Sequence, residues 1–120
     1  MAPTVLVVDD HPSFRSFARR LLEAAGYTVV DEAGDGAAAR EAVRAHRPDV
    51  VLLDVLLPDT TGFDLADELC SDRNGPVVVL TSSRTAADFD GSVERSSARG
   101  FISKRDLTPL AFAAVLGEAS

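Results

Sequence analysis

Short, continuous apolar runs alternate along the chain with segments in which apolar residues recur at helical spacing. The strand-like segments are residues 5–8, 27–32, 50–53, 77–80 and 101–102. Apolar runs of this length, bounded by glycine, proline and acidic residues, are typical of buried strands. The pattern therefore predicts five strands.

The clearest helical segment follows the first apolar run. Pro12 suits an opening helical turn, where its missing N–H costs little, and Gly26 ends the segment. The apolar face between them consists of Phe14, Phe17, Ala18, Leu21, Leu22 and Ala25. This spacing predicts a helix with one buried face.

Further helices are predicted between the remaining strands. Residues 36–46 form a second helical segment, which Pro48 ends, and residues 63–70 form a third. A turn at Asn74, Gly75 and Pro76 then leads into the fourth strand. The last helix opens at Thr108, a capping residue followed by proline.

Residues 85–98 form the least convincing helical segment. They include Asp90, Gly91 and three serines, and they offer few apolar anchors. We expect this segment to be the most mobile element. Five strands that alternate with helices imply right-handed crossovers and a parallel sheet covered on both faces, which is an α/β fold.

Length and charge narrow the class of protein. A chain of 120 residues suits one compact domain, and its single cysteine, Cys70, excludes an internal disulfide. The formal charge of −7 argues against direct binding of nucleic acid, which attracts basic surfaces. The chain has neither an apolar run of the ~20 residues that span a membrane nor a signal peptide, so we expect no membrane partner and a cytoplasmic protein.

Four of the strand-like runs end in a side chain that can bind phosphate or metal. Asp9 and Asp10 follow the first run, Asp54 the third, Thr81 the fourth and Lys104 the fifth. The carboxyl ends of parallel strands meet at one edge of a sheet, where open α/β folds bind ligands. The sequence therefore predicts that these five groups form one site.

The predicted site suits phosphoryl transfer. Three carboxylates make a hard, oxygen-rich pocket for Mg²⁺, and Asp54 can attack phosphorus as a carboxylate nucleophile. Lys104 would supply positive charge to the phosphoryl oxygens and Thr81 a hydrogen bond. Taken singly, an Asp-Asp pair is often only a turn or helix cap, and a lone polar residue at a strand end is often merely solvated. The joint pattern favours the site.

The motifs at these strand ends resemble those of a known family. They are Val-Asp-Asp-His-Pro at 8–12, Leu-Asp-Val-Leu-Leu-Pro-Asp-Thr-Thr-Gly at 53–62, Leu-Thr-Ser at 80–82 and Gly-Phe-Ile-Ser-Lys at 100–104. Over essentially its whole length the chain resembles the receiver domain of two-component response regulators. The first motif and Lys-Arg-Asp-Leu at 104–107 are similar to the branch that often carries a carboxyl-terminal helix-turn-helix DNA-binding domain.

The resemblance implies a flavodoxin-like (βα)5 fold, a doubly wound five-stranded parallel sheet of strand order 2-1-3-4-5, with residues 1–120 as a single receiver domain. It implies that Asp54 is the phosphoacceptor for a sensor histidine kinase. It also implies that Asp9, Asp10 and Asp54 bind Mg²⁺ together with the backbone carbonyl of Leu56. His11 has no catalytic role in this interpretation.

The resemblance further implies a conformational switch. Thr81 and Phe101 match the family's switch pair, which reshapes the surface formed by helix four, strand five and helix five. That surface is expected to contact a second subunit or an effector domain and to control transcription. The protein would then be a signalling phosphoacceptor that assists its own phosphorylation and dephosphorylation, and not an enzyme.

Some positions depart from the family's commonest pattern. Leu57, Ser82 and Arg105 stand where Met, a small Ala or Gly, and Pro are frequent. Leu56 and Ser83 occupy the positions that tune access of water to the phosphoryl group. Because an apolar Leu56 cannot orient water by hydrogen bonding, we expect a long-lived aspartyl phosphate. We expect Lys104 to keep its contact in spite of Arg105.

The final helix carries apolar residues nearly all round, at 110–116. One face must pack on the sheet, and we expect the surplus, Phe112 and Leu116, to be covered by a second subunit or a following domain. The alternative is a helix that is simply well buried at the end of the domain.

Two other functions have to be weighed. A phosphatase of the haloacid dehalogenase type also uses a strand-end Asp, but it needs a second Asp two residues on, where this chain has Leu56. A receiver-like module that binds partners without phosphorylation would be expected to lack a site residue, and all five are present. The weakly helical segment 85–98 keeps this alternative open as a question of output.

Overall fold

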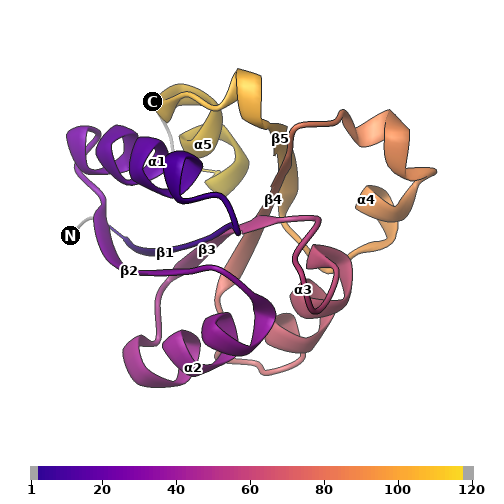
Figure 1. Cartoon of the computed structure of the whole chain (residues 1–120), viewed down its shortest axis with the longest axis horizontal. Coiled ribbons are helices and arrows are strands. Elements are labelled where there is room, and N and C mark those ends of the chain that lie inside the picture. The colour runs from indigo at the N-terminus through magenta and orange to yellow at the C-terminus, as the bar shows by residue number, and fades with distance from the viewer. Residues whose placement is uncertain (1–2, 118–120) are drawn as a thin grey trace.

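Five parallel strands form the central sheet of the computed structural model, which describes residues 3–117 (Figure 1). The strands are β1 (Thr4–Val8), β2 (Thr28–Ala33), β3 (Val50–Asp54), β4 (Val77–Ser82) and β5 (Gly100–Ser103). They are hydrogen-bonded in the order β2-β1-β3-β4-β5, and every pair is parallel. This order confirms the flavodoxin-like fold expected from the sequence.

Helices connect the strands and cover both faces of the sheet (Figure 1). They are α1 (Pro12–Ala24), α2 (Gly36–His46), α3 (Gly62–Cys70), α4 (Ser92–Arg95) and α5 (Pro109–Leu116), with the 3-10 turns η1 (Ala86–Phe89) and η2 (Lys104–Asp106). Within residues 3–117, no helix is long and apolar enough to cross a membrane.

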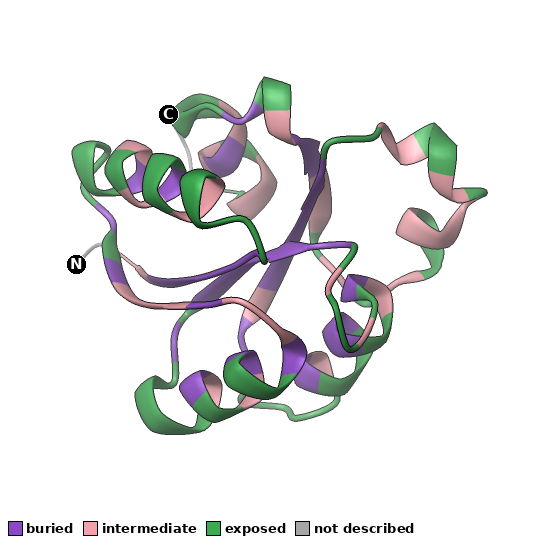
Figure 2. Cartoon of the chain, in the orientation of Figure 1, coloured by how far each residue is buried: buried purple, intermediate pink, exposed green. Residues whose placement is uncertain are grey.

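The sheet has one hydrophobic cluster on each face. Alternate strand residues such as Val7 and Leu52 pack with Leu22 of α1 and Phe112 of α5, while the residues between them pack with α2 and α3. All of β3 and nearly all of β1 are buried (Figure 2). Strands that are covered on both faces read as continuous apolar runs, which is why the sequence located them well.

The helix ends follow local chemistry. Asp35 accepts a hydrogen bond from the Ala38 N–H (2.7 Å) and begins α2, and Thr108 accepts one from the Ala111 N–H (3.0 Å) and begins α5. Gly26, with φ of 98°, follows the end of α1, because glycine adopts the left-handed region without strain. The predicted bounds of α1, α2 and α3 and the predicted start of α5 are confirmed to within about two residues.

The fourth connection is weakly helical, as the sequence indicates. It consists of the single turns η1 and α4. Asp90 and Gly91 between them have φ of 51° and 80°, and two consecutive left-handed residues cannot continue a right-handed helix. The higher mobility that we expect for this segment stays a prediction.

Two expectations about helix faces are wrong. Phe112 is fully buried and packs edge-on against Tyr27, with ring centroids 5.2 Å apart, so it is no part of an exposed surplus. Leu116 is half-buried, and the large apolar side chain that α5 exposes is Leu110, at 70%. In α1, Phe17 is 43% exposed and lies at the margin of the buried face.

Candidate functional site

The five predicted side chains lie together at the carboxyl edge of the sheet. Asp9 and Asp10 follow β1, Asp54 ends β3, Thr81 lies beside Asp54 in β4, and Lys104 follows β5. The Lys104 Nζ is 2.6 Å from Asp9 Oδ2 and 3.4 Å from Asp54 Oδ2. The expected lysine contact is therefore present with Arg105 in the next position.

The turn after β1 presents two carboxylates in different environments. Asp9 is fully buried, and its Oδ1 accepts a hydrogen bond from the His11 backbone N–H (2.8 Å), so this residue also shapes the turn. The Asp10 carboxylate is 38% exposed. Arg15 donates from Nη1 to the Asp9 carbonyl oxygen (2.6 Å) and pairs with Glu32 of β2 (3.2 Å). Hydrogen bonds to both the carboxylate and the carbonyl oxygen of Asp9 thus hold the turn.

The loop after β3 fixes Asp54 and depends on a glycine. Asp54 is only 4% exposed, and its Oδ1 accepts a hydrogen bond from the Leu56 N–H (3.2 Å). A Cβ atom on Gly62 would lie 2.5 Å from the Asp54 carbonyl oxygen, so only glycine lets α3 begin this close to the site. Asp59 accepts hydrogen bonds from the Gly36 and Ala37 N–H groups, which ties the loop to the start of α2.

The two buried carboxylates differ in acidity. Burial, and then the charge of Asp9, raise the pKa of Asp54 from 3.8 to about 6. Burial also acts to raise the pKa of Asp9, but the close Lys104 ammonium group and the hydrogen bond from the His11 backbone N–H outweigh it and lower the pKa below 3.8. Asp54 is the carboxylate that gains most from a further positive charge.

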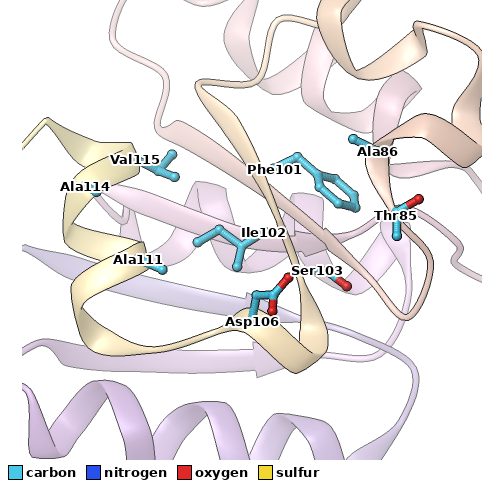
Figure 3. Close-up of a pocket in the computed structure, with 9 residues that line it drawn as sticks. All are labelled: Thr85, Ala86, Phe101, Ile102, Ser103, Asp106, Ala111, Ala114 and Val115. Atoms are coloured by element: carbon cyan, nitrogen blue, oxygen red, sulfur yellow. The ribbon is translucent and has the colours of Figure 1, made fainter.

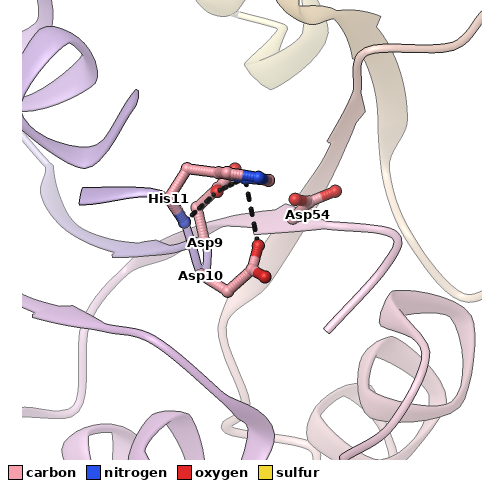
Figure 4. A group of neighbouring side chains, drawn as sticks. All are labelled: Asp9, Asp10, His11 and Asp54. Atoms are coloured by element: carbon pink, nitrogen blue, oxygen red, sulfur yellow. Dashed lines mark hydrogen bonds and ion pairs between the residues drawn. The ribbon is translucent and has the colours of Figure 1, made fainter. Parts of the chain in front are cut away.

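The donor atoms fit a small divalent cation. Oxygen or nitrogen atoms of Asp9, Asp10, His11 and Asp54 all lie within 4.8 Å of one another (Figure 4). Asp9 Oδ2 forms a close ion pair with Lys104 that is not aligned as a hydrogen bond, so this oxygen keeps lone pairs for a metal. Three carboxylates that lie close together suit a hard cation such as Mg²⁺.

Thr81 and Phe101, the residues expected to form a switch pair, lie on the adjacent strands β4 and β5. Thr81 is fully buried, and its Oγ1 has no hydrogen-bond partner within residues 3–117. A buried hydroxyl without a partner is costly, and a phosphoryl oxygen at the site would supply one. Phe101 is half-buried, and its ring lies 6.1 Å from that of Phe89.

Two residues at the rim of the site, Phe14 and Arg15, were missed by sequence reasoning, and a third, His11, was considered and given no catalytic role. The His11 Nδ1 lies 3.1 Å from carboxylate oxygens of both Asp9 and Asp10 (Figure 4). Arg15 holds the Asp9 carbonyl, and the Phe14 ring lies under Lys104, whose Nζ is 4.4 Å from the ring centroid. Phe14 and Arg15 read from the sequence as an apolar position and a polar position of a helix, so their spacing carries no signal for the site.

Comparison with known proteins places this geometry in a family. Residues 5–112 match the family model described as the response regulator receiver domain. The chain is 40% identical over 101 residues to the probable transcriptional regulatory protein NarL of Mycobacterium tuberculosis, which is 83% of this chain and 47% of that protein. It is also 40% identical over 88 residues to the DNA-binding response regulator MtrA of Mycolicibacterium smegmatis, which is 73% of this chain and 38% of that protein.

Solved structures agree with the sequence matches. The signal receiver domain of NarL from Mycobacterium tuberculosis has a TM-score of 0.82 and 33% identity, with 98% of each chain covered. A LuxR-family two-component response regulator from Aurantimonas has a TM-score of 0.83 and 27% identity, with 98% of this chain and 88% of that chain covered. These likenesses, one to NarL and one to a LuxR-family regulator, confirm the resemblance to response regulators.

The aligned segments span about half or less of the length of the curated relatives NarL and MtrA. Those relatives are transcriptional regulators, and the part that matches is the receiver portion. The family match, the likeness to solved receivers and the strand order all agree. This chain belongs to the receiver domain family of two-component response regulators.

Proposed function

We propose that residues 1–120 form one receiver domain in which Asp54 accepts a phosphoryl group from a sensor histidine kinase. The observation that carries this proposal is the position of a buried Asp54 carboxylate, paired with Lys104 and beside the Asp9 carboxylate. The domain acts as a signalling phosphoacceptor that assists its own reaction. It is not an enzyme with a separate substrate.

The transfer step uses groups that the site already holds. An Asp54 carboxylate oxygen attacks phosphorus, an O–P bond forms, and the P–N bond to the donor's phosphohistidine breaks. The electron pair stays on the histidine nitrogen, which takes a proton from solvent, and Asp54 becomes an acyl phosphate. Lys104 neutralises charge on the phosphoryl oxygens, and the Thr81 hydroxyl donates a hydrogen bond to one of them.

Asp9, Asp10, Asp54 and the Leu56 backbone carbonyl are the residues that would hold Mg²⁺. When bound, this ion supplies positive charge that offsets the repulsion between the carboxylates and the phosphoryl group. The clustering of the carboxylate oxygens, with Asp9 Oδ2 lacking an aligned hydrogen bond, supports this role.

Slow hydrolysis is part of the proposal. The Leu56 side chain is 53% exposed in the loop two residues after Asp54, and Ser83 is exposed two residues after Thr81. An apolar side chain at position 56 offers no hydrogen bond to orient an attacking water. The acyl phosphate should therefore persist for minutes or longer.

Output is proposed to pass through the surface formed by α4, β5 and α5. A groove of about 450 Å³ lies there along β5, with Phe101 and Ser103 of the strand, Thr85, Asp106 and Val115 among the residues that line it (Figure 3). When Thr81 turns toward a phosphoryl oxygen, the Phe101 ring moves into the space that it leaves. The partner is a second copy or an effector domain that controls transcription in the cytoplasm, and any DNA contact belongs to that domain.

A module that works without phosphorylation is the alternative. It would need neither a paired Asp54 nor a Thr81 hydroxyl without a partner, and the described part of the chain, residues 3–117, has both. The arrangement therefore favours the phosphoacceptor.

Intact mass spectrometry after incubation with acetyl phosphate and Mg²⁺ tests the proposal. We expect a gain of one phosphoryl group, lost when EDTA replaces Mg²⁺ and absent from Asp54→Ala. Removal of the donor and repeated sampling then give the lifetime. Equal incorporation by Asp54→Ala would refute the assignment, and a half-life of seconds would refute the slow hydrolysis.

A further inference from the structure

We propose that Phe14 is a positioning residue for Lys104, whose ammonium group it holds over the phosphoacceptor by a cation–π contact. The proposal deepens the proposed function and rests on it, because the position of Lys104 matters only if a phosphoryl group arrives at Asp54.

The contact is direct and partly shielded from water. The Lys104 Nζ lies over the Phe14 ring at 4.4 Å from its centroid, and the Lys104 side chain is only 17% exposed. An ammonium group within about 6 Å of a ring centroid is attracted by the ring, more strongly when water is excluded. Lys104 is therefore held by two carboxylates, Asp9 and Asp54, and by one aromatic face.

The ring itself is fixed in place. Phe14 lies in the first turn of α1, which Pro12 opens, and it packs against the hydrophobic cluster shared by α1 and α5. The Phe17 ring lies 6.1 Å away on the next turn. The Phe14 ring is thus packed against its neighbours, whereas the lysine stem has four rotatable bonds.

The ring matters most when a cation occupies the carboxylates. Asp9 and Asp54 are the groups that would hold Mg²⁺, and the positive charge of a bound ion would repel the Lys104 ammonium group and compete for its two carboxylate partners. The ring carries no net charge and is not a ligand for a hard cation, so its attraction for Lys104 survives. Phe14 then keeps Nζ beside Asp54 in the state that reacts.

A spectroscopic test is available because Lys104 is the only lysine among the twelve Lys and Arg residues of the chain. Protein labelled with ¹³C and ¹⁵N in lysine gives one set of side-chain signals. Protons over an aromatic ring are shifted upfield, so the Lys104 Hε signals of the unmodified protein should lie upfield of those of Phe14→Leu. Phe14→Tyr should retain the shift, and so should Phe17→Leu, which removes the exposed neighbouring ring.

The metal dependence sharpens this measurement. Addition of Mg²⁺ should leave the Lys104 signals upfield in the unmodified protein and should broaden them or move them to free-lysine values in Phe14→Leu. Unmoved lysine signals in Phe14→Leu, with or without Mg²⁺, would overturn the proposal whether or not Asp54 accepts a phosphoryl group.

Kinetics separate a positioning role from a structural one. With acetyl phosphate and Mg²⁺, Phe14→Leu should slow phosphorylation by about 3- to 10-fold, the size expected of one partly buried cation–π contact. Phe17→Leu and Phe14→Tyr should stay within about twofold of the unmodified rate. In a Lys104→Gln background, Phe14→Leu should change nothing further.

Each kinetic outcome has a distinct meaning. The same loss of rate in both backgrounds would overturn the proposal, because Phe14 would then act through the fold and not through Lys104. An unchanged rate in Phe14→Leu would overturn it as well. If the unmodified protein takes up no phosphoryl group, the proposed function fails, and the lysine spectrum still decides whether Phe14 holds Lys104.

Discussion

Asp9 and Asp54 are buried neighbours of the same residue type, yet the site shifts their pKa values in opposite directions. Asp9 receives the closer Lys104 contact and a backbone N–H, while Asp54 is buried beside the charge of Asp9. Buried like charges favour the protonated form of one partner. The site is therefore built at a cost in stability when no metal is bound.

This cost predicts a pH-dependent effect of Asp54→Asn on the free energy of unfolding. In the unfolded chain Asp54 loses its proton near pH 3.8, whereas in the folded protein it keeps the proton until about pH 6. The folded state therefore loses stability as the pH rises from about 4 to 6, and the loss is complete above that range.

Asn carries no charge, so Asp54→Asn should be more stable than the unmodified protein by about 1–3 kcal/mol at neutral pH in EDTA. The gain should shrink toward zero below about pH 4 and should fall when Mg²⁺ is added. Urea unfolding at a series of pH values measures it. A variant that is no more stable at neutral pH, or a gain that does not depend on pH, would contradict this account.

At the scale of elements, the starts and breaks of helices could be predicted from the sequence, but the face that a helix turns toward the sheet could not. Pro12, Thr108 and Pro109 located helix starts, and Asp90 with Gly91 signalled the break before α4. The rotation of α5 about its own axis could not be predicted from the sequence. A helix that is apolar on all sides has no single apolar face that must turn toward the sheet. Packing on the sheet decides that Phe112 points inward and Leu110 outward.

Gly62 begins α3 and lies against the backbone of Asp54, so its substitution should disturb both the helix and the site. In Gly62→Ala the new Cβ would overlap the Asp54 carbonyl oxygen and the Val55 Cα, 2.5 and 2.8 Å away, so the loop or α3 must move. We expect a loss of about 1–3 kcal/mol in the free energy of unfolding and slower phosphorylation.

Gly34→Ala is the matched control for this prediction. Its new Cβ would meet only the end of the flexible Arg15 side chain, at 3.4 Å, so it should be nearly neutral. Urea unfolding and intact mass compare the two variants. Equal behaviour of Gly62→Ala and Gly34→Ala would show that close packing of α3 on Asp54 is unimportant.

At the scale of the whole molecule, the fold could be predicted because the same pattern, an apolar strand followed by a helix, repeats along the chain. Each apolar strand ends in a polar group, and parallel strands bring Asp9, Asp54, Thr81 and Lys104 to one edge. Individual side-chain contacts between distant segments could not be predicted, because no repeated sequence pattern marks them. The Phe14 ring meets Lys104 from across 90 residues of chain, and Asp59 reaches back to the first turn of α2.

The same scale explains how a local reaction reaches a partner. Thr81 and Phe101 lie on the adjacent strands β4 and β5, and the groove along β5 is lined by Phe101. A change at Asp54 thus has a short path to the surface. The proposed switch acts on β5, which forms one edge of the sheet.

The most direct test of the central claim is to locate the phosphoryl group. Acyl phosphates are reduced by borohydride, which converts a phosphorylated aspartate to homoserine. After reaction with acetyl phosphate and Mg²⁺, reduction and peptide mapping by mass spectrometry should find homoserine at position 54 and at no other aspartate. Homoserine at Asp9, Asp10 or another aspartate, with position 54 unchanged, would contradict the account.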